Sequence, residues 1–196
     1  MSKTYKTILA DPPWEMNQTG TYGAIHQYPL MTMKQIMEMP IADLADPDGA
    51  HLWLWVTNGV IPYVNDVLNA WGFTYRSIFT WVKPRLGLGV YLRNASEQLI
   101  FATRGKNIAV RYRSQPTWAF APVQEHSHKP EEQYAIIERV SPGPYLELFA
   151  RRRQPGWDVW GNEIESDIEI PGYPVPKVRS LQTLDKEDAP DGKVGK

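Results

Sequence analysis

Short apolar runs alternate with segments of helical periodicity along most of this chain. Residues 5–10 form an apolar, β-prone run that stops at consecutive prolines, which is typical of a buried strand. Further runs of this kind predict strands at residues 51–57, 73–82, 98–103 and 145–149. Apolar residues at helical spacing predict helices that begin after Thr32, at Val60 and at Pro130, and that end before Pro40, at Gly72 and before Pro142.

This alternation of strands and helices indicates an α/β fold. Its sheet should be mostly parallel and covered by helices on both faces. A chain of 196 residues is long enough for one such domain, which we expect at residues 1–166. Residues 167–196 are rich in proline and charge, with few large apolar residues after Val178, and we expect a C-terminal tail that is mobile at its end.

The composition indicates the compartment of the protein and argues against a membrane segment. The absence of cysteine excludes disulfides and thiolate metal sites and fits a reducing compartment. The N-terminal segment reaches Asp11 before any long apolar run forms, so it does not resemble a signal peptide. The longest apolar run, residues 52–56, is far shorter than the roughly 20 residues of a membrane helix. We therefore expect a soluble, cytoplasmic protein with no membrane partner.

The charge is distributed unevenly along the chain. Residues 76–124 carry eight basic residues and one acidic residue, Glu97, a net charge of +7, whereas each flank carries −4. Seven aromatic rings are interleaved with these charges. Cations that neutralise phosphates and rings that stack on bases favour an unstacked or single-stranded nucleic acid as partner. The alternative is a solvated basic face above core aromatics.

The most specific chemical signal follows the first predicted strand, at Asp11-Pro12-Pro13-Trp14. Ligands bind at this end of the strands in open α/β sheets. An exocyclic amine that attacks a methyl donor has two hydrogens, and the Asp11 carboxylate and the Pro12 carbonyl can accept both. The two prolines stiffen the turn and donate no N–H, and Trp14 offers a face to a base taken out of its stack. The alternative is a rigid turn with a core tryptophan.

With these residues the chain resembles the MT-A70 family of adenine-N6 methyltransferases. The resemblance covers residues 5–165 and rests on blocks at residues 8–14, 28–31, 51–57, 80–84, 127–134 and 141–163. It implies a Rossmann-like sheet of about seven strands in a permuted order, with the Asp-Pro-Pro strand ahead of the main cofactor-binding segments. It also implies S-adenosylmethionine as the methyl donor and adenine N6 in nucleic acid as the acceptor.

The resemblance also implies a role for individual residues. The catalytic positions are Asp11, Pro12, Pro13 and Trp14. The cofactor-binding positions are Asp11, Lys129, Glu147, Phe149, Arg151, Asn162 and Glu163. The substrate-binding positions are Tyr28, Lys83, Arg85, Arg93 and Glu97, for which surface salt bridges are the alternative.

Two of the cofactor positions have independent chemical support. The ammonium of Lys129 would pair with the cofactor carboxylate, although a surface lysine at a helix start is the alternative. Glu147 lies between two leucines in a buried-looking strand, where a carboxylate is costly without donors. Spacing leaves open which of Arg151, Arg152 and Arg153 faces the cofactor.

The sequence predicts no metal site, and it favours DNA over RNA as the nucleic-acid substrate. His126 and His128 are two residues apart, but no cysteine, third histidine or clustered carboxylate follows at ligand spacing. Little chain precedes Tyr5, whereas larger relatives carry N-terminal segments for adenine contacts or RNA targeting. We therefore expect DNA as the substrate ahead of RNA, with no prediction of the oligomeric state.

Two other functions compete with this one. A catalytically silent relative could bind nucleic acid or support an active partner, but it would have no reason to keep both the Asp-Pro-Pro-Trp turn and Lys129, Glu147 and Asn162. A nucleotide-binding dehydrogenase would need a G-x-G-x-x-G fingerprint, which the sequence lacks.

Overall fold

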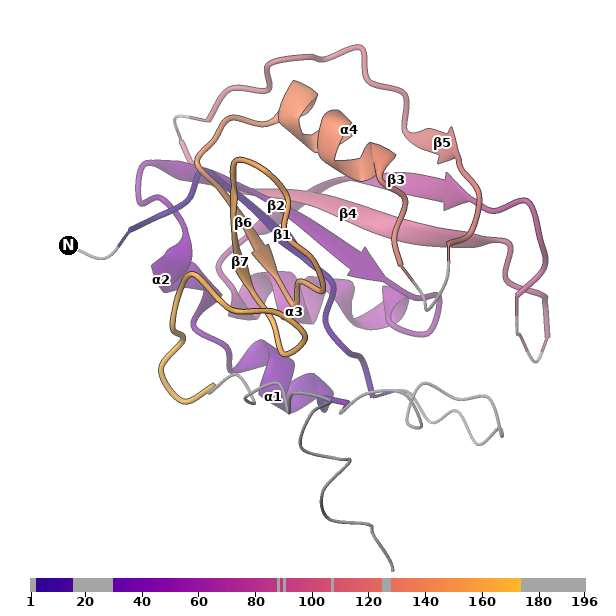
Figure 1. The fold of residues 1–196 in the computed structure, drawn as a ribbon, viewed down its shortest axis with the longest axis horizontal. Helices are drawn as coiled ribbons and strands as arrows, with labels where there is room; N and C mark the ends of the chain where they lie inside the picture. Colours follow the sequence, from indigo (N-terminus) through magenta and orange to yellow (C-terminus); the bar gives the residue numbers. More distant parts are fainter. Residues whose placement is uncertain are drawn as a thin grey trace, which may run out of the picture.

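The computed structural model describes residues 3–15, 30–87, 89, 91–106, 108–124 and 128–173. In this part of the chain a single sheet of seven strands runs through the molecule in the order β5-β3-β4-β2-β1-β6-β7 (Figure 1). The strands are β1 (Thr7–Ala10), β2 (Gly49–Val56), β3 (Thr74–Val82), β4 (Ser96–Gly105), β5 (Trp118–Phe120), β6 (Tyr145–Leu148) and β7 (Trp157–Trp160).

The sheet is mixed. Strand β4 runs antiparallel to both of its neighbours, β2 and β3, whereas the pairs β1–β2, β1–β6, β6–β7 and β3–β5 are parallel. Six strands therefore share one direction. The predicted strand number is confirmed, and the single reversal arises because β3 and β4 are joined directly by the loop at residues 83–95, without a crossover helix.

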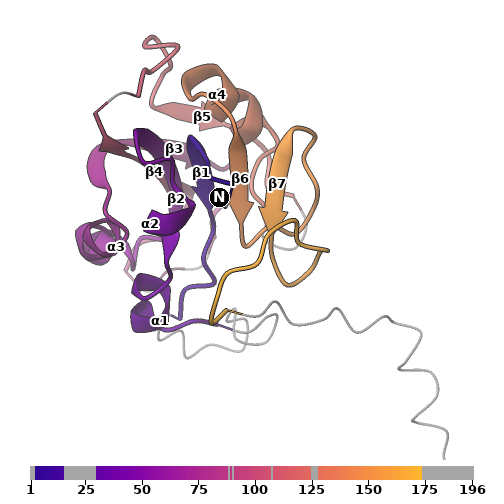
Figure 2. The same cartoon turned by 90° about the vertical axis from the view of Figure 1, so that its left-hand side faces the viewer.

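Helices cover both faces of this sheet (Figure 2). On one face lie α1 (Met33–Met37), α2 (Ile41–Leu44), the 3-10 turn η2 (Ile61–Tyr63) and α3 (Val64–Ala70), and on the other lies α4 (Glu132–Val140). Thr32 and Gln35 form a capping box at the start of α1. Gly72 follows α3 with φ of 74°, which ends that helix as the sequence predicts. In the described residues, no helix is long and apolar enough to span a membrane.

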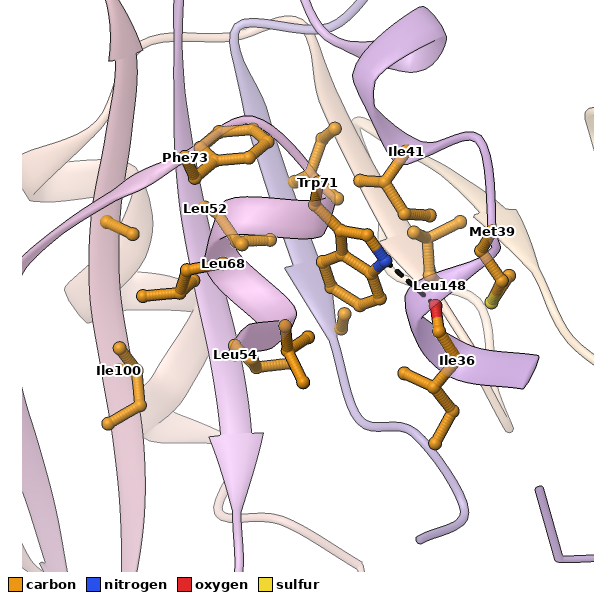
Figure 3. Packing of buried hydrophobic residues seen from close by; sticks show 14 of the residues in the cluster. Ile36, Met39, Ile41, Leu52, Leu54, Leu68, Trp71, Phe73, Ile100 and Leu148 are labelled. Carbon is orange, nitrogen blue, oxygen red and sulfur yellow. Dashed lines mark hydrogen bonds between the residues drawn. The ribbon is translucent and has the colours of Figure 1, made fainter. Parts of the chain in front are cut away.

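Each face of the sheet has its own core. On the α1–α3 side, the Trp71 ring packs among aliphatic side chains, and its Nε1 donates to the Ile36 carbonyl at 2.8 Å (Figure 3). On the α4 side, Leu9, Trp55 and Trp81 pack against that helix. Strand β1 contributes to both cores and is buried along its whole length. Burial on both faces explains why three of its four residues, Ile8, Leu9 and Ala10, are apolar in succession.

Three short elements escaped the sequence analysis: α2, β5 and β7, none longer than four residues. Residues 167–173, at the start of the expected tail, make contacts with the sheet and its core. Asp167 accepts from the Val159 backbone N–H at 2.9 Å, and Ile170 is buried in the core on the α1–α3 side. The packed domain thus extends to Tyr173, because Ile168 and Ile170 supply apolar contacts within a polar segment. The remainder of the expected tail, residues 174–196, lies outside the described residues.

Candidate active site

The candidate site lies where the adjacent parallel strands β1 and β6 end. Ala10 is in register with Leu148, so the next residues, Asp11 and Phe149, emerge side by side at the carboxyl edge of the sheet. Phe149 has a positive φ of 63°, which is uncommon outside glycine and typical of a constrained functional site. The hollow at this edge is lined by Asp11, Trp55, His128, Lys129, Gln133, Tyr134, Glu147, Phe149, Arg151 and Arg152.

A chain of ion pairs leads from strands β3 and β4 to Asp11 in the hollow. Lys129 Nζ lies 2.6 Å from Asp11 Oδ2 and 3.4 Å from Glu97 Oε2. Glu97 also pairs with Lys83. Burial raises the pKa of Glu97, but the charges of Lys129 and Lys83 outweigh it, so the net shift of that pKa is downward. The structure thus joins the predicted catalytic, cofactor and substrate positions Asp11, Lys129, Glu97 and Lys83 in one network.

Glu147 reaches the same hollow from the middle of β6. Its Oε2 accepts from the Tyr134 hydroxyl at 2.9 Å. Burial raises the pKa of Glu147 to about 7; the nearby Asp11 adds to this shift, while Tyr134 and Lys129 oppose it. Burial and the charge of Glu147 also raise the pKa of Tyr134, so its hydroxyl remains a donor. A carboxylate that accepts from the Tyr134 hydroxyl and lines the hollow can also accept hydroxyls from a ligand.

The three consecutive arginines have different surroundings. Arg151 and Arg152 line the hollow, and Arg152 also pairs with Glu131. Arg153 is turned away, because its guanidinium binds Asp167 at 3.0 Å and 3.1 Å. Spacing alone left this choice open, and the structure removes Arg153 from it.

The remaining cofactor positions lie beyond β7. Glu163 is 3.4 Å from Arg151 Nε, which links it to the hollow through that arginine. Asn162 and Glu163 are exposed and do not line the hollow themselves. Their loop is held close to the end of β6 at Gly161, where a Cβ would lie 2.0 Å from the Ala150 carbonyl oxygen.

The Asp-Pro-Pro-Trp turn is ordered by its own backbone and by Trp14. The Pro12 carbonyl accepts from the Trp14 backbone N–H at 2.9 Å, and the Pro13 carbonyl accepts from the Met31 N–H at 2.8 Å. Trp14 is only 8% exposed, and its Nε1 donates to the Trp55 carbonyl at 3.1 Å. The expected open stacking face is therefore not met; Trp14 packs in the core and anchors the turn. The Pro12 carbonyl keeps one lone pair for a ligand.

The structure describes two of the three other predicted substrate-binding residues, and neither lies in the hollow. Arg85 and Arg93 are exposed on the loop between β3 and β4, where Arg93 Nε donates to the Gly87 carbonyl at 2.7 Å. Tyr28 and His126 lie outside the described residues. In the described ranges, no group of three His, Cys, Asp or Glu side chains is placed to hold a metal ion.

Sequence reasoning missed several residues of the site. Trp55 lies beneath Lys129, whose Nζ is 5.4 Å from the ring centroid, and Trp55 Nε1 donates to Gln133 at 2.8 Å. Gln133 follows Lys129 by four residues, and Tyr134 comes next. The buried side of α4, read from its periodicity, could have pointed to Gln133 and Tyr134, whereas nothing in the sequence distinguishes Trp55 from the other core tryptophans.

Comparison with known proteins shows one family. The family model described as MT-A70 matches residues 5–163. The chain is 31% identical over 172 residues to the human N(6)-adenosine-methyltransferase catalytic subunit METTL3, which covers 82% of this chain and 28% of that protein. It is 30% identical over 182 residues to the human N(6)-adenine-specific methyltransferase METTL4, covering 83% of this chain and 38% of that protein.

A bacterial relative is of similar length. The type II methyltransferase M.MunI of Mycoplasma sp is 29% identical over 197 residues, covering 86% of this chain and 82% of that protein. The chain therefore spans less than two fifths of the two human relatives but most of this bacterial one.

Proposed function

This chain belongs to the MT-A70 family of adenine-N6 methyltransferases, and from this premise we propose that it methylates N6 of adenine in nucleic acid, DNA ahead of RNA. The observation that carries the proposal is the contact of Lys129 with Asp11 beside Glu147, at the ends of β1 and β6. One hollow therefore holds Asp11, a carboxylate that can accept an N–H of the substrate amine, together with Lys129 and Glu147, which can bind a charged cofactor.

The donor set fits S-adenosylmethionine, the cofactor of such enzymes. Its carboxylate would pair with the ammonium of Lys129, its amino group with Asp11, and its ribose hydroxyls with Glu147. Phe149 offers an apolar surface, and Arg151 and its partner Glu163 add polar groups at the rim. Asn162, exposed in the same loop, would reach the ribose from outside the hollow.

When bound, the cofactor supplies an electrophilic methyl group, and the chain's own residues prepare the amine. The Asp11 carboxylate accepts one N–H of the exocyclic nitrogen, and the Pro12 carbonyl accepts the other, which directs the nitrogen lone pair away from both. Lys129 holds the Asp11 side chain in place at 2.6 Å. After transfer the nitrogen must lose a proton, and Asp11 Oδ1 or Oδ2 is positioned to receive it.

Two observations support a nucleic acid as the substrate. The stretch at residues 76–124, with its net charge of +7, contributes Lys83 and Glu97 to the ion-pair network. M.MunI, which matches this chain over most of both proteins, is a type II methyltransferase, and this favours DNA as the substrate.

The deciding experiment measures transfer of labelled methyl from S-adenosylmethionine to DNA and RNA of one sequence, followed by digestion and identification of the methylated nucleoside. We expect N6-methyladenine in the DNA at a higher rate than in the RNA. Faster transfer to RNA would reverse the substrate assignment. Binding of nucleic acid without any transfer would favour the catalytically silent alternative.

A further inference from the structure

Strand β5 (Trp118–Phe120) lies at the edge of the sheet (Figure 1). It carries two exposed aromatic side chains, Trp118 and Phe120. Among the strands of the described residues, β5 pairs with β3 alone. Trp118 is 59% exposed and Phe120 is 62% exposed, whereas Ala119 between them packs against the core on the α4 side. Since side chains alternate along a strand, both rings lie on the opposite face, two residues apart. Two exposed rings on one face of an edge strand form a candidate interaction surface.

The position of β5 relates these rings to the candidate active site. Phe120 is in register with Val82, and the next residue, Lys83, begins the network that leads through Glu97 and Lys129 to Asp11. Both rings are therefore at the same end of the sheet as the site. Strand β5 is four strand spacings from β1, which is about 19 Å at the usual separation.

The charge of the surrounding chain identifies the occupant. Strand β5 lies within residues 76–124, whose one acidic residue, Glu97, is engaged by Lys83 and Lys129. Arg113 is exposed on the segment that leads into β5. Flat rings in a segment with a net charge of +7 match a polyanion that carries flat bases, and each base–ring stack is sequence-tolerant. An apolar protein partner would gain nothing from the cations.

We propose that Trp118 and Phe120 form an accessory nucleic-acid subsite, at which unpaired bases flanking the target adenine stack. The inference rests on the proposed function and extends it: the substrate is a strand with unstacked nucleotides on one side of the adenine. A distance of about 19 Å corresponds to roughly five or six nucleotides at the rise of a stacked DNA strand, but to only about three when the strand is unstacked and extended to roughly twice that rise. Contact with the subsite thus requires a substrate that extends at least this far.

The test combines a double variant, Trp118→Ala with Phe120→Ala, and oligonucleotides of two lengths. Tyr75→Ala is the matched control, because Tyr75 is a 42% exposed ring at the opposite end of neighbouring β3. Labelled single strands carry one adenine with about ten nucleotides or about one nucleotide on either side, lengths chosen to exceed or fall short of the reach of an extended strand. Affinity is measured by fluorescence anisotropy, and methyl transfer is measured on the same strands.

We expect the double variant to bind the long strand roughly 25-fold or more weakly, about 5-fold for each ring. Its affinity for the short strand should change less than twofold, and its methyl transfer to saturating short strand should stay as in the wild type. Tyr75→Ala should behave as the wild type with both lengths. Trp118→Phe should retain most of the affinity for the long strand, because it keeps an aromatic ring.

Three outcomes would overturn the subsite. These are unchanged binding of the long strand by the double variant, an equal loss with both lengths, or sedimentation showing that the double variant converts a dimer of this chain to monomers. Failure of the proposed function has a separate signature, because the wild type would then transfer methyl to neither strand whatever the variants bind.

Discussion

Lys129 connects Asp11, at the end of β1, with Glu97, on β4. Its ammonium lies between the carboxylates of Asp11 and Glu97 and above the Trp55 ring. A cofactor carboxylate would compete with Glu97 for this ammonium, while Asp11 stays in place for the amine. Asp11 and Glu97 therefore have separable roles, although both contact the same lysine.

For Asp11, we predict that Asp11→Ala lowers kcat by roughly 10²–10⁴-fold, the range for a positioned acid–base group. The side chain follows a strand and is not part of either core, so the thermal unfolding temperature should change little. Methyl transfer and circular dichroism provide the two measurements. Asp66→Ala, on the exposed side of α3, is the control and should be fully active. Near-normal transfer by Asp11→Ala would remove Asp11 from the mechanism.

For Glu147, the raised pKa predicts opposite pH dependences of stability and cofactor affinity. The pKa is about 7 in the folded protein against 4.5 for the free group, so the folded state binds the proton more tightly. Stability should then fall as the pH rises from 4.5 to 7. Cofactor affinity should rise through pH 7, because only the ionised carboxylate accepts from both ribose hydroxyls.

The check for Glu147 uses denaturant unfolding and calorimetry on either side of this pKa, with Glu147→Gln as the comparison. The amide does not titrate, so both pH dependences should flatten in the variant. A wild-type affinity that is constant across pH 7 would mean that Glu147 does not contact the cofactor in its ionised form.

Among the elements, the close approach of β6 and β7 positions the cofactor side of the site. Gly161, just after β7, lies against Ala150, just after β6, and a Cβ there would be 2.0 Å from the Ala150 carbonyl oxygen. The obstacle is backbone, which cannot rotate away. The spacing of the two loops therefore sets where Phe149, Arg151 and Glu163 lie relative to one another.

We predict that Gly161→Ala lowers both stability and cofactor affinity. Forcing the strand ends apart should destabilise the protein by at least about 1–3 kcal/mol, as overpacking does. Gly156→Ala is the control, since it has a φ of 82° but open space around it, and its cost should be about 1–2 kcal/mol of backbone strain. Only Gly161→Ala should weaken cofactor binding. Equal cofactor affinities of the two variants would show that the loop spacing is unimportant for the site.

At the scale of the whole molecule, the charge of residues 76–124 should control how nucleic acid binds. If its exposed cations contact phosphates, affinity for a single strand should fall by about 0.7 log units per log unit of salt for each contact. Cofactor affinity should depend little on salt, because its partners are in a partly buried hollow. Joint replacement of Arg85 and Arg93 by alanine should flatten the slope by about one to two contacts.

The salt titration of nucleic-acid binding checks this prediction directly. Arg153→Ala is a suitable control, because the Arg153 side chain is bound to Asp167 and does not line the hollow. The control should keep the wild-type slope. A slope that is unchanged in the Arg85 and Arg93 double variant would mean that the loop charges are solvated and that the strand enters elsewhere.

Features that local patterns encode could be predicted before the structure was known. Periodicity located β1, the capped start of α1 and helix α4, because a buried run, a capping residue and a 3.6-residue period each act over a few residues. The Asp-Pro-Pro turn at the end of β1 likewise indicated that the site lies at the carboxyl ends of the strands. Asp11, Lys129 and Glu147 could be named for the site because their motifs are specific, and the structure brings them into one hollow.

The other features of the site depend on contacts between residues far apart in the chain, which no local pattern encodes. Lys129 meets Asp11 across 118 positions of the chain, and it meets Glu97 only because antiparallel β4 is inserted between β2 and β3. The assignment of Trp14 to the core and the exposure of Trp118 follow from which strands lie inside the sheet and which lie at its edge. The same residue type has the same local preference in both places, so strand order, which no local pattern specifies, separates a core tryptophan from a surface one.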